Sequence, residues 1–156
     1  MPAPLRYPLR IPPDVIWLFN AGLMWLMAVA TPRLVVPGWL RVGTGAVLLT
    51  GGVGWIVGAR VALSRADTTW SPMTPGRTTR LVTTGVYAFS RNPMYLGMQL
   101  VLLGWAALLA SPAALLVSTG FFLTIDRFQI APEERALAAG FGPEFLEYKA
   151  RVRRWI

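Results

Sequence analysis

Four long apolar stretches dominate the chain, and short segments containing polar residues, glycine or proline separate them. They cover approximately residues 15–30, 39–61, 94–110 and 113–130. A transmembrane helix needs about 20 mostly apolar residues, within a range of about 17 to 25. The pattern therefore predicts an all-α, polytopic membrane protein with about four transmembrane helices, organised as a single domain over residues 1–156.

The first stretch also has features of a cleaved secretory signal. Arg6 and Arg10 precede it, and the small-residue sequence Ala28-Val29-Ala30 ends it. However, it is rich in tryptophan and contains Asn20, unlike a plain leucine or alanine core. Three remaining spans would also form a poor helical bundle. We therefore interpret this stretch as the first transmembrane helix.

The composition supports a membrane protein and removes several kinds of chemistry. Hydrophobic residues make up 54% of the chain and charged residues 14%, whereas about 25% of an ordinary soluble domain is charged. The chain has no cysteine and no histidine, which excludes disulfides, thiol nucleophiles, zinc-finger ligands and histidine-dependent triads. Candidate chemistry must come from Arg, Asp, Glu, Asn, Tyr and the backbone.

Basic residues are distributed unevenly between the connections. The net charge is +8, but the basic residues flank apolar stretches and do not form a solvated nucleic-acid-binding domain. Thirteen lie before the first stretch, around the loop 64–92 or after the fourth stretch, against two near the first loop. The positive-inside rule then places both termini and this loop in the cytoplasm, in an inner or plasma membrane. Such a bias also argues against a dual-topology transporter.

The third and fourth stretches are joined by only Ala110, Ser111 and Pro112. Serine is a favourable N-cap, and proline is favourable at the first helical position. The two helices must therefore form a tight antiparallel hairpin, which brings their outer ends together. In the second stretch, Gly54 and Gly58 have the four-residue spacing that lets membrane helices pack closely.

The tail, residues 131–156, is predicted to be helical in two pieces. Pro132 would begin the first piece and Gly140 would end it, with acidic residues in the first turn, where the helix dipole favours them. The second piece would begin at Pro143 and lie on the bilayer as an interfacial amphipathic helix. Its apolar face would contain Phe145, Tyr148, Val152 and Trp155.

The densest group of polar residues beside an apolar stretch is the run 81–97, LVTTGVYAFSRNPMYLG. Asn92 and Pro93 fit a helix start with asparagine as the cap, and such an end binds anions or carboxylates. Arg91 can clamp a carboxylate or phosphate, or it can extend to lipid headgroups. Simple capping and headgroup contact therefore remain open as the ordinary roles of Asn92 and Arg91.

A second set of charged residues follows the fourth stretch. Glu133 and Glu134 are adjacent on a predicted helix, so their side chains diverge by about 100° and cannot face one ligand atom together. One can reach a binding site while the other stabilises the helix start. Asp126 and Arg127 lie at the end of the span, where charges are costly and more often functional. Neutralising partners in the middle loop are their alternative role.

Three linked blocks of the sequence resemble the isoprenylcysteine carboxyl methyltransferase family and its phospholipid methyltransferase relatives. The blocks are LVTTGVYAFSRNPMYLG, PEERAL and FGPEFLEYKARV, which together cover about half of the chain in the family's order and spacing. Linked blocks are far more specific than one short motif. The resemblance implies an integral membrane enzyme that uses S-adenosyl-L-methionine to methylate its substrate.

The resemblance also implies a cofactor site and its residues, with no metal. The cofactor-binding residues would be Leu81, Val82, Tyr87, Arg91, Asn92, Tyr95, Glu133 and Glu134. The acidic pair would contact the ribose or amino group of the cofactor, and a helix N-terminus with an arginine suits its methionine carboxylate. Arg127 is the candidate catalytic residue, which would position an anionic methyl acceptor.

Two departures from the family pattern change the expected substrate and site. Asn92 stands where the family has histidine, so any role that needs a titrating imidazole is lost while hydrogen bonding and capping remain. The chain is also shorter than the eukaryotic carboxyl methyltransferases. We therefore expect a small lipophilic or amphiphilic acceptor that enters from the bilayer at the cytoplasmic interface. The expected partners are this acceptor and membrane lipids.

Two other functions fit a helical membrane protein with a polar cytoplasmic site. One is an NADPH-dependent membrane reductase of the sterol reductase type, although a dinucleotide should need a larger cavity and more phosphate-binding groups than this short hairpin offers. The other is a non-catalytic membrane scaffold of the same fold. Binding of S-adenosylhomocysteine, of NADPH or of neither distinguishes the three.

Overall fold

The computed structural model describes residues 11–66 and 80–156. These residues form helices and connecting segments, and no strand occurs among them. Arg6, Arg10 and Arg77, which were used above in the charge count, lie outside the described residues, as do residues 67–79 of the segment between the second and third stretches. The predicted all-α fold is confirmed for the described part of the chain.

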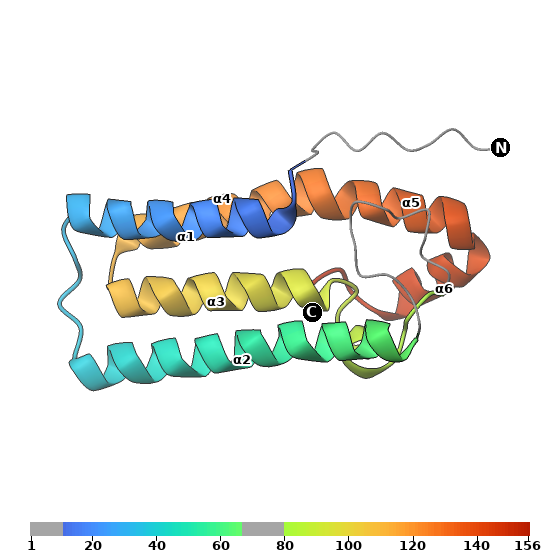
Figure 1. Cartoon of the computed structure of the whole chain (residues 1–156), viewed down its shortest axis with the longest axis horizontal. Coiled ribbons are helices and arrows are strands. Elements are labelled where there is room, and N and C mark those ends of the chain that lie inside the picture. The colour runs from blue at the N-terminus through green and yellow to red at the C-terminus, as the bar shows by residue number, and fades with distance from the viewer. Residues whose placement is uncertain (1–10, 67–79) are drawn as a thin grey trace.

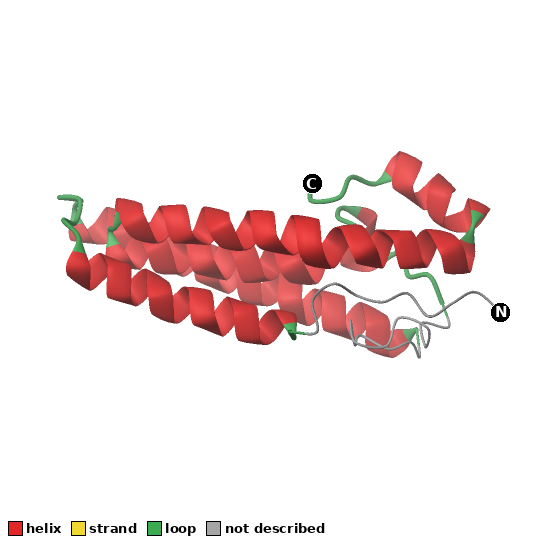
Figure 2. Ribbon diagram, turned by 90° about the horizontal axis from the view of Figure 1, so that it is seen from above, coloured by secondary structure: helices red, strands yellow, loops and turns green. Residues whose placement is uncertain are grey.

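Four long helices run side by side and carry a smaller helical unit at one end (Figure 1). Figure 1 shows α1 alongside α4 and α2 alongside α3. Figure 2, seen from above, shows the chain after α5 turning back toward the bundle. The long helices are α1 Pro13–Ala30, α2 Gly38–Arg65, α3 Pro93–Leu109 and α4 Pro112–Ile125. The smaller elements are η2 Gly85–Ala88, the π-helical turn η3 Asp126–Ile130, α5 Ala131–Phe141 and α6 Pro143–Arg151.

Three helices of the described chain are long and apolar enough to cross a membrane. They are α1, α2 and a continuous helix over Pro112–Phe141. The third predicted span corresponds to α3, which is apolar but has only 17 residues. Ten of these residues are buried, against three in each of α1 and α2. Helix α3 is therefore the central helix of the bundle.

Close contact between α2 and α3 depends on two pairs of glycines. Added Cβ atoms at Gly52 and Gly97 would each lie 2.6 Å from the other residue's carbonyl oxygen. The pair Gly45 and Gly104 is less close, at 3.3 and 3.0 Å. Small residues let membrane helices approach closely. The predicted packing role of Gly54 is wrong, because a Cβ there would meet nothing within 4 Å, and Gly58 approaches only Val86.

The hairpin between α3 and α4 has the predicted turn. The Ser111 hydroxyl accepts a hydrogen bond from the Ala114 N–H at 3.2 Å, and Pro112 occupies the first helical position. Ala110 adopts a left-handed conformation with φ 48°. Its carbonyl accepts a hydrogen bond from the Leu34 N–H at 2.8 Å, which ties the α1–α2 connection to the same end of the bundle.

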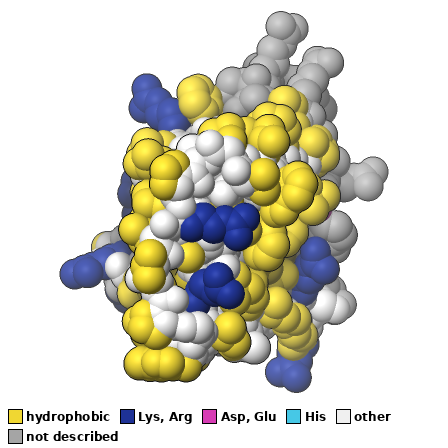
Figure 3. Space-filling model, turned by 90° about the vertical axis from the view of Figure 1, so that its left-hand side faces the viewer, with side chains coloured by type: hydrophobic (Ala, Val, Ile, Leu, Met, Phe, Trp, Pro, Cys, Tyr) yellow, Lys and Arg dark blue, Asp and Glu magenta, His cyan; other side chains and the backbone are white. Residues whose placement is uncertain are grey.

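The described acidic residues lie away from the end of the bundle that carries the α3–α4 turn. Residues 15–66 and 80–125 contain no Asp or Glu, and Asp14 begins α1 at the opposite end. Figure 3 views the end formed by the α1–α2 connection and the α3–α4 turn, and shows apolar surface with a few Lys or Arg side chains. The carboxylates of the described chain are therefore concentrated at the end that carries α5 and α6.

The expected helix start at Pro132 is wrong. Helices α4 and α5 are continuous through the π-helical turn, in which the Ala131 N–H bonds to the Asp126 carbonyl. A π-helical turn accommodates Pro132, because proline has no N–H to continue the regular ladder. The expected end at Gly140 is also wrong. The helix ends instead at Phe141 and is followed by Gly142, whose φ of 51° is readily available only to glycine.

The last helix packs against the protein. Phe145 and Tyr148 are only 1% and 3% exposed, so their burial comes from contacts inside the protein. Helix α6 ends at Arg151, and Val152 is extended. The expected helical face that includes Val152 and Trp155 is therefore wrong, because residues after Arg151 turn back toward the start of α3.

Candidate functional site

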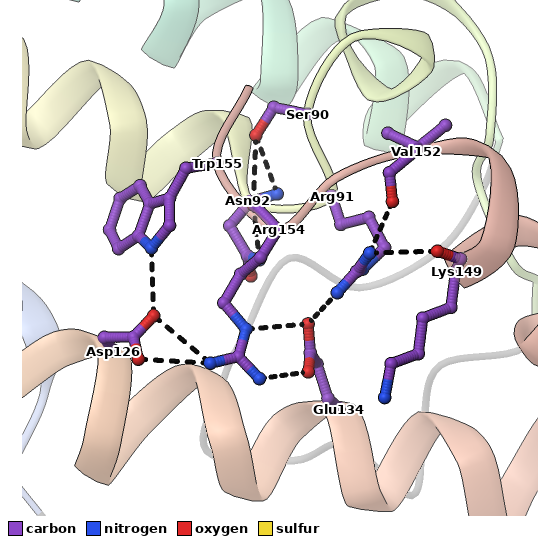
Figure 4. Close-up of polar contacts among 9 residues, drawn as sticks. All are labelled: Ser90, Arg91, Asn92, Asp126, Glu134, Lys149, Val152, Arg154 and Trp155. Carbon is purple, nitrogen blue, oxygen red and sulfur yellow. Dashed lines mark hydrogen bonds and ion pairs between the residues drawn. The ribbon is translucent and has the colours of Figure 1, made fainter.

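Five of the predicted site residues, Arg91, Asn92, Tyr95, Glu133 and Glu134, lie at the end of the bundle where the start of α3, the turn η3, α5 and the chain after α6 converge; Figure 4 shows three of them. Two neighbouring groups of polar side chains occur here. The first is the Glu134 ion-pair cluster, which we define as Arg91, Asp126, Glu134 and Arg154. The second is the Glu133 site, which we define as Tyr95, Gln129 and Glu133.

Both oxygens of Glu134 are occupied by arginines. Its Oε1 lies 2.7 Å from Nη2 of Arg91, and its Oε2 lies 2.6 Å from Nη2 of Arg154. The side chains of Arg91 and Glu134 are each 8% exposed. Buried charges need such pairing, because leaving one unpaired is strongly destabilising. Glu134 therefore holds α5 to the start of α3 and to the C-terminal segment.

The two terminal nitrogens of the predicted clamp, Arg91, bond within the protein, whereas its Nε is buried without a hydrogen-bond partner among the described residues. Besides Glu134, the Arg91 guanidinium donates to the carbonyls of Val152 and Lys149, the latter at 3.3 Å. Its backbone N–H donates to the carbonyl of Arg153 at 3.0 Å. Figure 4 shows these contacts linking the segment before α3 to the segment after α6. In this arrangement Arg91 organises the C-terminal segment.

The predicted cap at Asn92 is wrong in its detail. Asn92 does occupy the N-cap position of α3, but its side chain makes no capping hydrogen bond. Its amide donates to the carbonyl of Arg154 at 3.0 Å, and its backbone N–H donates to the Ser90 hydroxyl at 3.1 Å. An amide can make this bond without a titrating imidazole, so Asn92 also anchors the C-terminal segment.

Sequence reasoning missed the role of Arg154. Its guanidinium bridges Glu134 and Asp126, with Nη1 lying 3.1 Å from Oδ2 of Asp126. Hydrogen bonding to Glu134 is the largest cause that raises the pKa of Arg154 above its ordinary value, and the charge of Asp126 adds to it. The expectation that Asp126 is neutralised by the middle loop is wrong for the described residues, because its ion-pair partner comes from the tail.

Trp155 completes the attachment of the tail. Its indole N–H donates to Oδ1 of Asp126 at 2.9 Å, and its ring lies 4.6 Å from the ring of Phe122 between centroids. In the sequence, Arg154 and Trp155 belong to a basic, aromatic ending that is typical of headgroup contact. Their pairing with one aspartate depends on the chain's reversal after α6, which no local pattern indicated.

The Glu133 site is organised differently. Glu133 Oε1 accepts hydrogen bonds from the Tyr95 hydroxyl and from Nε2 of Gln129, each at 2.7 Å. Its Oε2 has no hydrogen-bond partner among residues 11–66 and 80–156. The expected divergence of the two glutamates is therefore observed, and only Glu133 retains an oxygen that can accept a bond from a ligand.

Tyr87 and Tyr148 lie beside this site. The Tyr148 hydroxyl donates to the Tyr87 carbonyl at 2.7 Å. Burial is the main cause that raises the pKa of the Tyr87 phenol, and the nearby charges of Tyr148 and Glu133 raise it further. Leu81 and Val82 are half-buried in the non-helical segment before η2. Tyr87 therefore supplies an uncharged wall near Glu133.

Arg127, the candidate catalytic residue, is not brought into either group. Its side chain is exposed, and neither the Glu134 ion-pair cluster nor the Glu133 site bonds to it. The neighbouring Asp126 does reach the cluster. Consecutive residues on a helix point in different directions, so the position of Asp126 carries no information about the direction of Arg127.

The two glutamates differ in what their oxygens leave free. No group of three or more metal-ligating side chains occurs among the described residues. Both carboxylate oxygens of Glu134 are paired with arginine. In Glu133, two neutral donors hold Oε1, and Oε2 remains available. A carboxylate oriented in this way accepts hydrogen bonds from hydroxyl or amino groups.

A cavity of about 160 Å³ lies on another side of α3. Met94 and Met98 contribute from α3, and the rest of its lining comes from α1 and α2. A cavity of roughly this size can hold a group about as large as benzene. Its other lining residues are Asp14, Trp17, Leu18, Ile56 and Arg60. Mostly apolar walls with two charged residues suit an amphiphilic molecule.

Comparisons with known proteins point to methyltransferases. The model of the phospholipid methyltransferase family matches residues 40–144, which include the Glu133 site. Protein-S-isoprenylcysteine O-methyltransferase of Homo sapiens is 40% identical over 75 residues, 46% of this chain and 25% of that protein. The Saccharomyces cerevisiae protein of the same name is 39% identical over 75 residues, 46% of this chain and 30% of that protein.

An uncharacterized protein of Haemophilus influenzae is 46% identical over 63 residues, which are 40% of this chain and all of that protein. No solved structure matches the chain. The alignments with the two named methyltransferases thus span less than a third of each relative's length.

Proposed function

Because the chain belongs to the phospholipid methyltransferase family, we propose that it transfers a methyl group from S-adenosyl-L-methionine to a small lipophilic or amphiphilic acceptor. The transfer would occur at the cytoplasmic face of the membrane. The named relatives are protein-S-isoprenylcysteine O-methyltransferases. Neither the reductase nor the scaffold hypothesis has comparable support.

The observation that carries this proposal is the unpaired oxygen of Glu133. Two neutral donors, Tyr95 and Gln129, hold Oε1 at 2.7 Å and leave Oε2 without a described partner. A carboxylate oxygen suits the ribose hydroxyls of S-adenosylmethionine, and neighbouring phenol rings suit a sulfonium. The residues present therefore fit this cofactor.

We divide the predicted cofactor-binding residues into those that would contact the cofactor and those that would hold the surrounding chain in place. Glu133 carries the free oxygen and would contact the cofactor together with Tyr95, which holds it. Leu81, Val82 and Tyr87 are half-buried and would supply the walls. The remaining members, Arg91, Asn92 and Glu134, would fix the chain around it through their bonds to the tail. This division departs from a direct carboxylate clamp by Arg91, whose two terminal nitrogens bond within the protein.

The cofactor would supply an electrophilic methyl group, so the protein needs to align the acceptor and exclude water. The chain's own residues supply walls and hydrogen-bond acceptors. The cavity beside Met94 and Met98 would receive the apolar part of the acceptor. Arg127 is exposed at the end of α4 and would meet an anionic acceptor that approaches from the lipid side.

We further propose four spans, with both termini in the cytoplasm. Helix α3 has 17 residues and a length of about 26 Å, near the lower limit for crossing a hydrocarbon core of about 30 Å. The continuous helix Pro112–Phe141 has 30 residues, or about 45 Å. Its last third would therefore extend beyond the hydrocarbon core and carry Glu133 and Glu134 into the cytoplasmic interface.

Calorimetric titration of the purified full chain in detergent with S-adenosylhomocysteine tests the proposal. We expect wild-type binding, together with about 10-fold to 100-fold weaker binding by Glu133→Gln, because a carboxylate bond contributes about 1.5–3 kcal/mol. Glu144→Gln, a change of the same kind at an exposed position of α6, is the matched control and should bind normally.

A parallel titration with NADPH distinguishes the alternatives. Binding of NADPH without S-adenosylhomocysteine would support a reductase, and binding of neither would support a scaffold. Equal affinities of wild type and Glu133→Gln for S-adenosylhomocysteine would contradict the assignment of Glu133 while leaving methyl transfer itself intact.

A further inference from the structure

Gln129 is a residue that the cofactor assignment did not include, and one of its polar atoms lacks a partner. The residue is 3% exposed, and its Oε1 is buried without a hydrogen bond. Buried polar atoms are nearly always hydrogen-bonded, so an exception needs a physical explanation such as a bound ligand or water. Gln129 lies in the π-helical turn, and such turns are frequent at functional sites.

The orientation of the Gln129 amide follows from its partner. Its Nε2 lies 2.7 Å from Oε1 of Glu133. In its carboxylate form Glu133 only accepts hydrogen bonds, and its Oε1 already faces the Tyr95 hydroxyl, so the amide nitrogen of Gln129 faces Glu133 and the amide oxygen points elsewhere. The unpaired Oε1 of Gln129 is therefore an acceptor, and an amide flip would place two acceptors against each other.

Two acceptor oxygens consequently belong to one hydrogen-bonded pair of side chains. One is Oε1 of Gln129, and the other is Oε2 of Glu133. Residues four positions apart lie on the same face of a helix, so these two side chains share one face of the continuous helix. Two acceptors on directly hydrogen-bonded side chains can match two adjacent hydroxyl donors, as in the cis-diol of a ribose.

We propose that Gln129 binds the methyl donor directly, an inference that rests on the proposed function. Its Oε1 accepts a hydrogen bond from one ribose hydroxyl, and Glu133 accepts one from the other. Its Nε2 has a second role, which is to hold Glu133 together with Tyr95. Gln129 is thus a cofactor-binding residue that selects a ligand with a vicinal diol.

The same reasoning does not extend to Gln99, which provides a matched control. Gln99 is also buried, at 8% exposure, and its Oε1 is also without a partner. However, its Nε2 donates to the Ser118 hydroxyl at 2.9 Å. A hydroxyl can accept or donate, so the Gln99 amide orientation is not determined by its partner and Gln99 has no carboxylate beside it.

The test measures dissociation constants of the full chain in detergent for S-adenosylhomocysteine and for its 2′,3′-dideoxy analogue. Wild type should bind the analogue about 100-fold more weakly, because two hydrogen bonds are lost at about tenfold each. Gln129→Met, of similar length but without hydrogen-bonding groups, should bind S-adenosylhomocysteine at least tenfold more weakly. It should bind the analogue almost as wild type does. Gln99→Met should change neither constant by more than about twofold.

Equal weakening of both ligands by Gln129→Met would overturn the proposal, because a purely structural role does not depend on the ribose hydroxyls. Unchanged affinity for both would overturn it as well. If Gln129→Met fails to fold, Gln129→Asn withdraws the amide by one methylene and should show the same selective loss in weaker form. Failure of wild type to bind S-adenosylhomocysteine would refute the proposed function itself, a result separate from any effect of Gln129.

Discussion

Glu133 and Glu134 are neighbours in the chain, yet they occupy opposite kinds of site. Glu134 has both oxygens paired with arginines that belong to the start of α3 and to the tail. Glu133 has one oxygen held by two neutral donors and the other unpaired among the described residues. Saturated charges join segments of a protein, whereas an oriented but unsaturated group can bind a ligand. The pair therefore separates the structural role from the binding role.

The largest expected effect is a loss of stability when Glu134, whose two oxygens are both paired, is replaced. Glu134→Ala leaves Arg91 buried without its carboxylate, and loss of one partner of a buried pair costs about 3–5 kcal/mol. We expect a much lower melting temperature in detergent, measured by scanning fluorimetry. Glu144→Ala on the exposed surface of α6 is the control and should melt as wild type does. A melting temperature of Glu134→Ala equal to that of the control would show that the cluster does not hold the tail.

The next effect is a loss of cofactor affinity when Glu133, which has one unpaired oxygen, is replaced. Glu133→Gln keeps an oxygen that Tyr95 and Gln129 can still reach, so the free energy of unfolding should change by at most about 1 kcal/mol. Stability and cofactor affinity should therefore separate in this variant, with affinity for S-adenosylhomocysteine falling strongly. A loss of stability as large as that of Glu134→Ala would remove the distinction between the two glutamates.

A smaller effect should follow from Trp155→Phe. This change keeps an aromatic ring against Phe122 but removes the indole hydrogen bond to Asp126. The expected destabilisation is about 1 kcal/mol, measured by thermal melting. Trp155→Ala should cost more, because it also removes the ring contact. Identical melting temperatures for the two variants would mean that ring packing contributes nothing to attachment of the tail.

The smallest effect is a change in alkaline stability at Tyr148. Burial raises the pKa of Tyr148 to about 12 from its ordinary value of 10.0, although the charge of Arg91 opposes this. A folded pKa above the unfolded value means that this contribution to stability is complete below pH 10 and is lost as pH rises toward 12. Melting temperatures measured from pH 8 to 11 should therefore fall less in Tyr148→Phe than in wild type. Parallel pH curves would refute this contribution.

Sequence patterns predicted the regular parts of the fold well. Apolar length located α1, α2, α3 and α4 within a few residues, and the Ser111–Pro112 turn has the expected cap. The partners across the bundle were not predictable in the same way. Four-residue glycine spacing indicated Gly54 and Gly58, whereas the close contact with α3 is made by Gly45 and Gly52. Spacing along one helix does not determine which face meets a neighbour.

The candidate site was also predictable only in part, because the sequence indicated some of its residues but not their partners. Family motifs identified Tyr95 and Glu133, which the structure brings into one hydrogen-bonded group. They did not identify Gln129 or Arg154, since neither lies in a matched block. They also could not show that Arg91 would be engaged by carbonyls of the tail, because that contact joins segments about 60 residues apart.

The sequence by itself determined the class of protein, its long apolar helices, its hairpin and the set of polar residues available for chemistry. These properties depend on local composition and spacing, which act within one helix or turn. Only the tertiary structure decided which glutamate is saturated, which amide has an unpaired oxygen and which arginine binds the tail. These properties depend on the direction of each side chain in the π-helical turn and on the reversal after α6. Both follow from packing between distant segments.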